Sequence, residues 1–291
     1  MTQRRESTPP EAPTRASPPP RASQPPPRPS QPPPRGSIPP PAQAKRTRAA
    51  REIEEPADCL AAALRARSSS RRAAWAKRGL ARAGDEIDPD IQLLLLRQLY
   101  LAQLEEEDFE GALAIANQMT QVGPLKDVAH HDRARVLVAR GELRKATEAQ
   151  RLASRHAPPQ RRSFHTFALA QLQHFAGESE TSLRTLERAL RWSHRDRPLV
   201  RGFRAYVELE TDRVPEALEA TRRALSASPM REGYGQFVLG MIAWHLGDKR
   251  MATVHLRAFL RKNASADKAK AATLREELKR ARQVLSQTES D

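Results

Sequence analysis

The sequence has little of what a secreted domain or a membrane protein needs. It holds one cysteine, Cys59, so no disulfide can form within the chain, and a reducing compartment is favoured. The longest apolar run near the middle, residues 91–96, is far too short to cross a bilayer. Arg4 and Arg5 are followed by proline-rich sequence rather than an apolar segment, which argues against a secretory signal. We therefore expect a cytoplasmic protein with a packed, inert thiol.

Motifs for catalysis and for nucleotide or metal binding are also missing. The chain contains no P-loop, G-x-G-x-x-G, G-x-S-x-G, H-E-x-x-H or C-x-x-C sequence. His130 and His131 are the only adjacent histidines, and neighbouring side chains on a helix point about 100° apart, so they are poorly placed to share one metal ion. We expect no enzymatic activity, no cofactor and no metal.

Proline and charge are distributed unevenly. Residues 1–50 hold 16 of the 24 prolines and almost no bulky apolar residue, which predicts a disordered Pro/Arg-rich arm. Of the net charge of +15, this arm carries +7 and residues 93–265 carry another +7. The motif Pro-Pro-Pro-Arg ends at Arg21, Arg28 and Arg35. The arm is therefore a flexible spacer or a ligand for an aromatic-lined domain.

The most regular feature that is present is a small residue at the start of five amphipathic stretches. These residues are separated by 34, 36, 35 and 35 positions: Ala112, Ala146, Ser182, Ala217 and Ala252. Two short helices can cross closely only where a small side chain lies between their axes. A pair of short helices buries too little surface alone, so neighbouring pairs must stack and share a core. The period therefore predicts an all-α array of helix pairs.

The residues around these positions resemble the tetratricopeptide repeat family over roughly residues 93–265. The fullest copy has Leu239-Gly240, Gly247-Asp248, Ala252 and Phe259, and the others keep Phe109, Ala112 and Pro124; Gly141, Ala146, Ala153 and Pro158; and Ala217, Ala224 and Pro229. The third copy departs at Ser182 and His194. The resemblance implies a right-handed α-solenoid of about five to six helix-turn-helix repeats. It also implies that the first helix of each pair lines a concave face that holds a peptide or partner helix.

The flanking segments predict additional helices. Residues 51–92 read as a degenerate first repeat, with helices from Pro56 to about Arg67 and from Ser70 to about Ala83 and a crossing at Ala73 or Ala74. In residues 266–291 one narrow apolar stripe recurs at helical spacing, at Ala271, Leu274, Leu278, Ala281 and Leu285. This stripe predicts a helix that caps the exposed edge of the last repeat and frays after about Gln287.

Carrying the groove positions of the family onto this chain gives the candidate binding residues. In the last three copies they hold seven of the 13 aromatic residues, which predicts an exposed apolar patch, and in the first two they include Arg97, His131 and Arg135. The candidates are Arg97, His131, Arg135, Phe164, Phe167, Phe175, Tyr206, Tyr234, Phe237, Met241 and Trp244.

The function expected from these residues is a non-enzymatic scaffold or adaptor. Its partner would be a protein or peptide that is apolar, with acidic residues over the first two copies. The alternative is a basic helical-repeat protein that associates with nucleic acid, although no nucleic-acid motif accompanies the charge. Salt dependence separates the two, because phosphate-driven affinity falls steeply with ionic strength.

Overall fold

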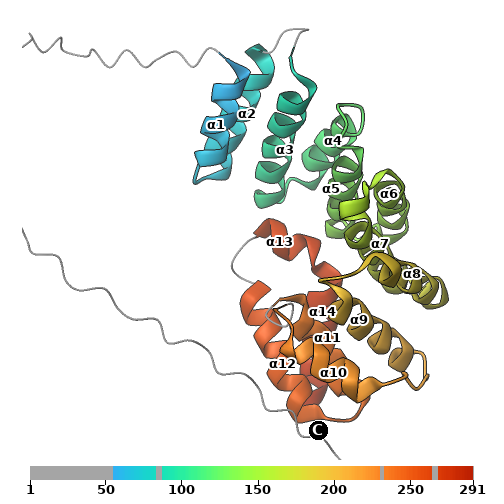
Figure 1. The fold of residues 1–291 in the computed structure, drawn as a ribbon. Helices are drawn as coiled ribbons and strands as arrows, with labels where there is room; N and C mark the ends of the chain where they lie inside the picture. The colour runs from blue at the N-terminus through green and yellow to red at the C-terminus, as the bar shows by residue number, and fades with distance from the viewer. Residues whose placement is uncertain (1–54, 83–86, 230–232, 264–267, 291) are drawn as a thin grey trace, which may run out of the picture. The chain divides into compact units, whose positions relative to one another are not determined.

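In a computed structural model of the chain, the described residues are 55–82, 87–229, 233–263 and 268–290. Every regular element in these ranges is a helix, and the first twelve follow one another in six pairs (Figure 1). The pairs are α1 (Pro56–Arg65) with α2 (Ser69–Arg82), α3 (Pro89–Glu105) with α4 (Phe109–Met119), α5 (Lys126–Ala139) with α6 (Leu143–His156), α7 (Pro159–Phe175) with α8 (Ser179–Trp192), α9 (Arg197–Glu210) with α10 (Leu218–Ala227), and α11 (Tyr234–His245) with α12 (Lys249–Asn263). Helices α13 (Lys268–Thr273) and α14 (Arg275–Ser290) follow. The predicted all-α pairing is confirmed, whereas the predicted arm of residues 1–50 lies outside the described residues.

Residues 50–291 belong to one unit in which each helix pair contacts the next. Within the described ranges, no helix is both long and apolar enough to cross a bilayer.

The turn inside five of the pairs repeats with the period of the sequence. One residue in each turn has a positive φ, at intervals of 34, 36, 35 and 35: Glu107, Gly141, Gly177, Asp212 and Gly247. In each turn the next amide donates to the carbonyl five residues earlier, as Asp248 does to Ala243 at 2.9 Å. This hydrogen bond closes the first helix in a Schellman motif. The turns therefore mark the repeat independently of the small residues.

Small residues lie where the two helices of a pair cross, as predicted, in four of the five copies. These four side chains have no exposed surface: Ala112, Ala146, Ser182 and Ala252. Between α7 and α8, the Ser182 hydroxyl donates a 2.7 Å hydrogen bond to the carbonyl of Ala170. Between α11 and α12, a Cβ on Gly240 would stand 2.6 Å from Leu256 Cδ2, so only glycine permits this approach without a shift of Leu256.

The prediction for the remaining copy, at Ala217, is wrong. Ala217 is exposed, has a φ of 52° and precedes α10 rather than lying in it. The other four second helices begin three residues before their small residue, which would place this start at Val214. Because Pro215 disfavours helical backbone at the residue before it, Val214 stays outside the helix and is 95% exposed. The shortened α10 fully buries only Leu225, which packs against Gly202 of α9.

The first pair crosses at a different residue from the one expected. Ala74 is exposed and Ala73 is only half-buried, so neither lies at the crossing. A Cβ on the buried Gly79 would stand 2.9 Å from Cys59 Cβ in α1 and from Leu95 Cδ1 in α3. Gly79 therefore lets α2 approach both helices. The thiol of Cys59 is free and fully buried, as predicted.

The C-terminal helix α14 packs on several pairs rather than on the last one alone. The buried residues of its predicted apolar stripe join the core of α7, α9, α11 and α12: Leu278, Ala281 and Leu285. Arg275 Nη1 also donates a 2.9 Å hydrogen bond to the carbonyl of Ala139 at the end of α5. The apolar stripe is confirmed, but α14 reaches beyond the last pair. The helix extends to Ser290, and fraying after Gln287 stays a prediction.

Candidate functional site

Most of the aromatic residues expected on an open concave face are buried. Five candidates lie in the core: Phe167, Phe175, Tyr206, Phe237 and Met241. The four aromatic rings among them pack edge to face with one another or with Phe203. The centroids are 5.6 Å apart for Phe167 and Phe203 and 5.9 Å apart for Tyr206 and Phe237. The expectation that these five residues form an exposed patch is wrong. They fill the interior between α7, α9, α11 and α14.

Helix α14 covers this cluster on the side of α5, α7, α9 and α11 that we call the inner face. The guanidinium of Arg280 lies 5.0 Å from the ring centroid of Phe175. Its Nη1 donates to the hydroxyl of Tyr206 at 2.8 Å and to Glu210 Oε1 at 2.6 Å, and His174 Nε2 lies 2.8 Å from the other Glu210 oxygen. Burial acts to raise the pKa of Glu210, but contacts with His174, Tyr206 and Arg280 lower it to about 2. An ionised, partly buried pair therefore holds α14 on the inner face.

Three aromatic candidates remain at least partly accessible. Phe164 is 48% exposed on α7, and its ring meets that of His131 edge to face at 5.0 Å. Tyr234 and Trp244 on α11 are half-buried. Trp244 lines a pocket of about 680 Å³ beside α14, where most of the other lining groups are polar. The accessible rings are thus divided between two places rather than gathered in one groove.

The basic candidates do not form an unpaired positive patch. Arg97 Nε donates to Asp132 Oδ2 at 2.8 Å, and Arg135 Nη1 lies 3.5 Å from Asp132 Oδ1. The carboxylate of Asp132 is fully buried, so its charge acts strongly on both guanidinium groups. Burial lowers the pKa of His131 to about 4, which keeps its imidazole neutral at pH 7. These residues therefore carry about one net positive charge, which is a weak basis for attracting acidic ligands.

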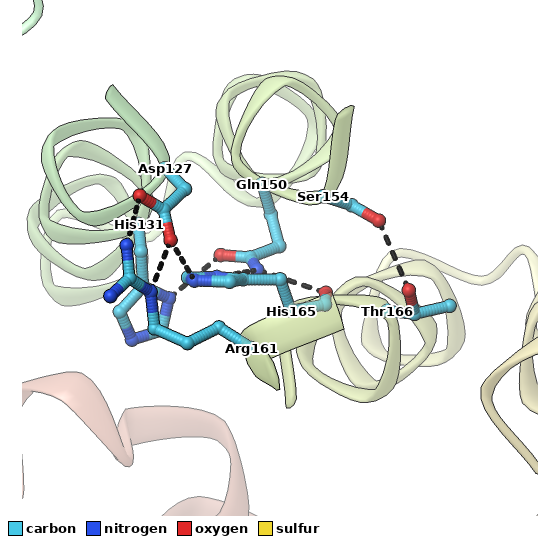
Figure 2. A network of polar contacts seen from close by, with 7 residues as sticks. All are labelled: Asp127, His131, Gln150, Ser154, Arg161, His165 and Thr166. Atoms are coloured by element: carbon cyan, nitrogen blue, oxygen red, sulfur yellow. Dashed lines mark hydrogen bonds and ion pairs between the residues drawn. The ribbon is translucent and has the colours of Figure 1, made fainter. Parts of the chain in front are cut away.

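A buried polar network joins α5, α6 and α7 (Figure 2). The guanidinium of Arg161 donates to the two oxygens of Asp127 at 2.6 and 2.8 Å, and His165 Nε2 lies 3.1 Å from Asp127 Oδ2. The Gln150 amide nitrogen donates to the carbonyl of His165 at 3.0 Å, and Gln150 Oε1 lies 2.8 Å from His131 Nδ1. The network thereby fixes the ring of His131.

The pKa shifts in this network suit a structural role. Burial acts to raise the pKa of Asp127, but the hydrogen bonds and the positive charge of Arg161, together with smaller contributions from other contacts, lower it overall. Burial lowers the pKa of His165 as well, although Asp127 opposes that change. With His131 neutral, Gln150 Oε1 accepts a hydrogen bond from the Nδ1–H tautomer. The charged pair is therefore Asp127 with Arg161, and the imidazoles are neutral hydrogen-bonding groups.

A pocket of about 380 Å³ lies between the inner face and the C-terminal segment, by which we mean residues 268–290. Four aromatic rings line it: His131, Phe164, Phe167 and Tyr234. The apolar walls include Leu172 and Leu199, and the C-terminal segment contributes Leu274 and Glu277. Phe167 and Tyr234 meet edge to face at 6.3 Å. An apolar pocket of this size with a few polar groups is typical of ligand sites.

Glu277 is the most unusual polar group of this pocket. Its side chain is 6% exposed, and the hydroxyl of Tyr234 donates to its Oε1 at 2.9 Å. The other two buried acids each have an arginine partner, Arg161 for Asp127 and Arg97 for Asp132. In the part of the chain that the structure describes, no basic side chain lies within ion-pair distance of Glu277. Burial raises the pKa of its carboxyl to about 7, against the hydrogen bond from Tyr234.

Sequence reasoning missed Glu277, Arg280 and Phe203. Glu277 lies three residues after Leu274 and one before Leu278, so its position beside the apolar stripe could have predicted a buried acidic residue. The pairing of Arg280 with Glu210 joins residues 70 positions apart, and no local pattern predicts it. Among the described residues, no three His, Cys, Asp or Glu side chains converge as a metal site requires.

No protein-family model matches this chain, and no curated protein is similar to it in sequence.

Proposed function

We propose that this chain is a non-enzymatic interaction scaffold of the tetratricopeptide type, acting in the cytoplasm. In this proposal the first helices form the concave face of a right-handed solenoid, and that face binds an amphipathic helix of a partner polypeptide. The regular turns and the buried small residues at the helix crossings support the family resemblance. The burial of the thiol of Cys59 is compatible with a reducing compartment.

One observation carries the proposal: the inner face already binds an amphipathic helix, which is α14. Its apolar stripe enters the aromatic core, and Arg280 forms an ion pair with Glu210. A partner helix with the same spacing of apolar residues and a basic residue opposite Glu210 would make the same contacts. Displacement of α14 would uncover Phe175, Tyr206 and Phe237, so the buried rings become the binding surface only when α14 leaves.

Binding in trans of the α14 sequence tests this proposal. The double variant Leu278→Asp with Leu285→Asp should release α14, because both side chains are buried. A labelled peptide of residues 268–290 should then bind the variant at least tenfold more tightly than the wild-type chain in fluorescence anisotropy. Adding Glu210→Gln to the variant should weaken this binding. The matched control is Gln283→Asp with Ser286→Asp, two exposed positions of the same helix.

A natural partner is then sought with the released variant. A protein captured from native lysate supports the proposal only if the peptide of residues 268–290 competes it away and if Glu210→Gln weakens its capture. The proposal fails if the released variant remains folded and binds the peptide no better than the wild-type chain.

A further inference from the structure

The pocket between the inner face and the C-terminal segment contains more negative than positive charge. Glu277 lies on one wall and Asp196 on another, and neither has an ion-pair partner among the described residues. Arg135 is the only arginine or lysine in the lining, and it lies 3.5 Å from the buried carboxylate of Asp132. His131 also lines the pocket and is neutral at pH 7. An anionic ligand would therefore meet repulsion, whereas a cation would meet an unpaired carboxyl.

The shape and chemistry of the walls favour the same kind of ligand. The rings of Phe164, Phe167 and Tyr234 line one space. Aromatic faces attract ammonium and guanidinium groups, most strongly where water is excluded. Leu172 and Leu199 supply apolar surface for the part of a ligand that carries the cation. A buried carboxyl without a cation is costly to ionise, and a bound cation would remove that cost.

We propose that this pocket binds an organic cation, an ammonium or guanidinium group on an apolar stem, with the cation beside Glu277 and the stem against Phe164, Phe167 and Leu172. The cation belongs to a free amine or to a lysine or arginine side chain of a polypeptide that reaches the pocket while α14 stays on the inner face. Only the second source rests on the proposed scaffold function, so the free-amine experiment can fail or succeed independently of it.

Three small probes that share one aromatic body test the charge preference. We expect phenethylamine to bind the full-length chain at pH 8 at least tenfold more tightly than phenethyl alcohol in isothermal titration calorimetry, and phenylacetate to bind most weakly. Glu277→Gln keeps the size of the side chain and an acceptor for Tyr234, and it should reduce the amine preference to less than twofold. Glu276→Gln, one residue away and outside the pocket lining, should leave the preference unchanged.

Two further measurements distinguish charge recognition from a change in fold. Phe164→Leu alters a ring that is 48% exposed, so the fold should survive while amine affinity falls at least threefold. Amine affinity should rise between pH 5 and pH 8, with proton release on binding, because the bound cation favours ionised Glu277. The charged and titratable groups that line the pocket beside Glu277 are His131, Arg135, Asp196 and Tyr234, and the charges of Glu276 and Arg280 act on Glu277 from outside the lining.

The source of the cation is tested with two short apolar peptides, one with a central lysine and one with norleucine at that position. If the wild-type chain prefers the lysine peptide and Glu277→Gln loses that preference, the ligand is a polypeptide side chain. If the chain binds the amine but neither peptide, the ligand is a free amine. Equal binding of amine and alcohol, tighter binding of the acid, an amine preference that survives Glu277→Gln, or no binding of any probe would overturn the proposal.

Discussion

Replacing Glu277 by glutamine should stabilise the folded chain at neutral and alkaline pH. Its carboxyl is 6% exposed, and burial raises the pKa from 4.5 to about 7. The unfolded chain releases this proton near pH 4.5, but the folded chain keeps it up to about pH 7. Stability therefore falls as the pH rises between these values. At about 1.4 kcal/mol per pKa unit, the loss reaches roughly 3 kcal/mol above pH 7. Glutamine has no charge to bury and still accepts the hydrogen bond from Tyr234.

Urea unfolding of wild-type and Glu277→Gln chains at several pH values measures this effect. The variant should be more stable by up to about 3 kcal/mol at pH 8, and the difference should vanish at pH 4. Amide hydrogen exchange in α14 should show slower opening of that helix in the variant at pH 8. Glu276→Gln serves as the control and should show little pH-dependent gain. Equal stability of wild type and Glu277→Gln at pH 8, or a gain that does not depend on pH, would refute the reasoning.

The helix pairing could be predicted because its determinants are local in sequence. A small residue at a crossing and a left-handed turn residue are each set by a few neighbouring positions, and both recur with the same period. The prediction failed at Ala217, because a proline disfavours helical backbone at the residue before it and Pro215 therefore prevents Val214 from starting α10. In the first pair, Gly79 rather than an alanine allows the close approach to Cys59.

The concave surface could not be predicted in the same way. A helix-period pattern places Phe167, Tyr206 and Phe237 on one side of their helices, but it does not say what covers that side. The covering element is α14, which contacts α5 although more than a hundred residues separate them. These contacts form because the C-terminal part of the chain folds back toward the earlier helices, and no local sequence pattern predicts that. The same stripe of aromatic residues is therefore a core here, where an uncovered array would present it as a groove.

Three further substitutions test the fold and the polar network. Ala252→Leu should overpack the α11–α12 crossing and lower the free energy of unfolding by about 1–3 kcal/mol. The control Val254→Leu, at a 54% exposed position, should change it little. Equal stability of both variants would contradict the placement of Ala252 at the crossing. Asp212→Gly should raise the free energy of unfolding by about 1 kcal/mol, because glycine adopts the φ of 56° without a Cβ penalty. An unchanged midpoint of urea unfolding would contradict backbone strain at this turn. Asp127→Asn should lower the free energy of unfolding by about 1–3 kcal/mol at pH 7, because it removes a charge that accepts two hydrogen bonds from Arg161. The side chain of Arg161 is 42% exposed, so water partly screens the loss and the lower end of that range is expected. Since the folded-state pKa of Asp127 lies below 3.8, the stabilisation is present above pH 3.8 and is lost as the pH falls through the folded-state pKa. Wild-type and Asp127→Asn chains should therefore converge in stability as the pH falls below 3.8. A gap that stays constant as the pH falls would show that the charge of Asp127 does not stabilise the network.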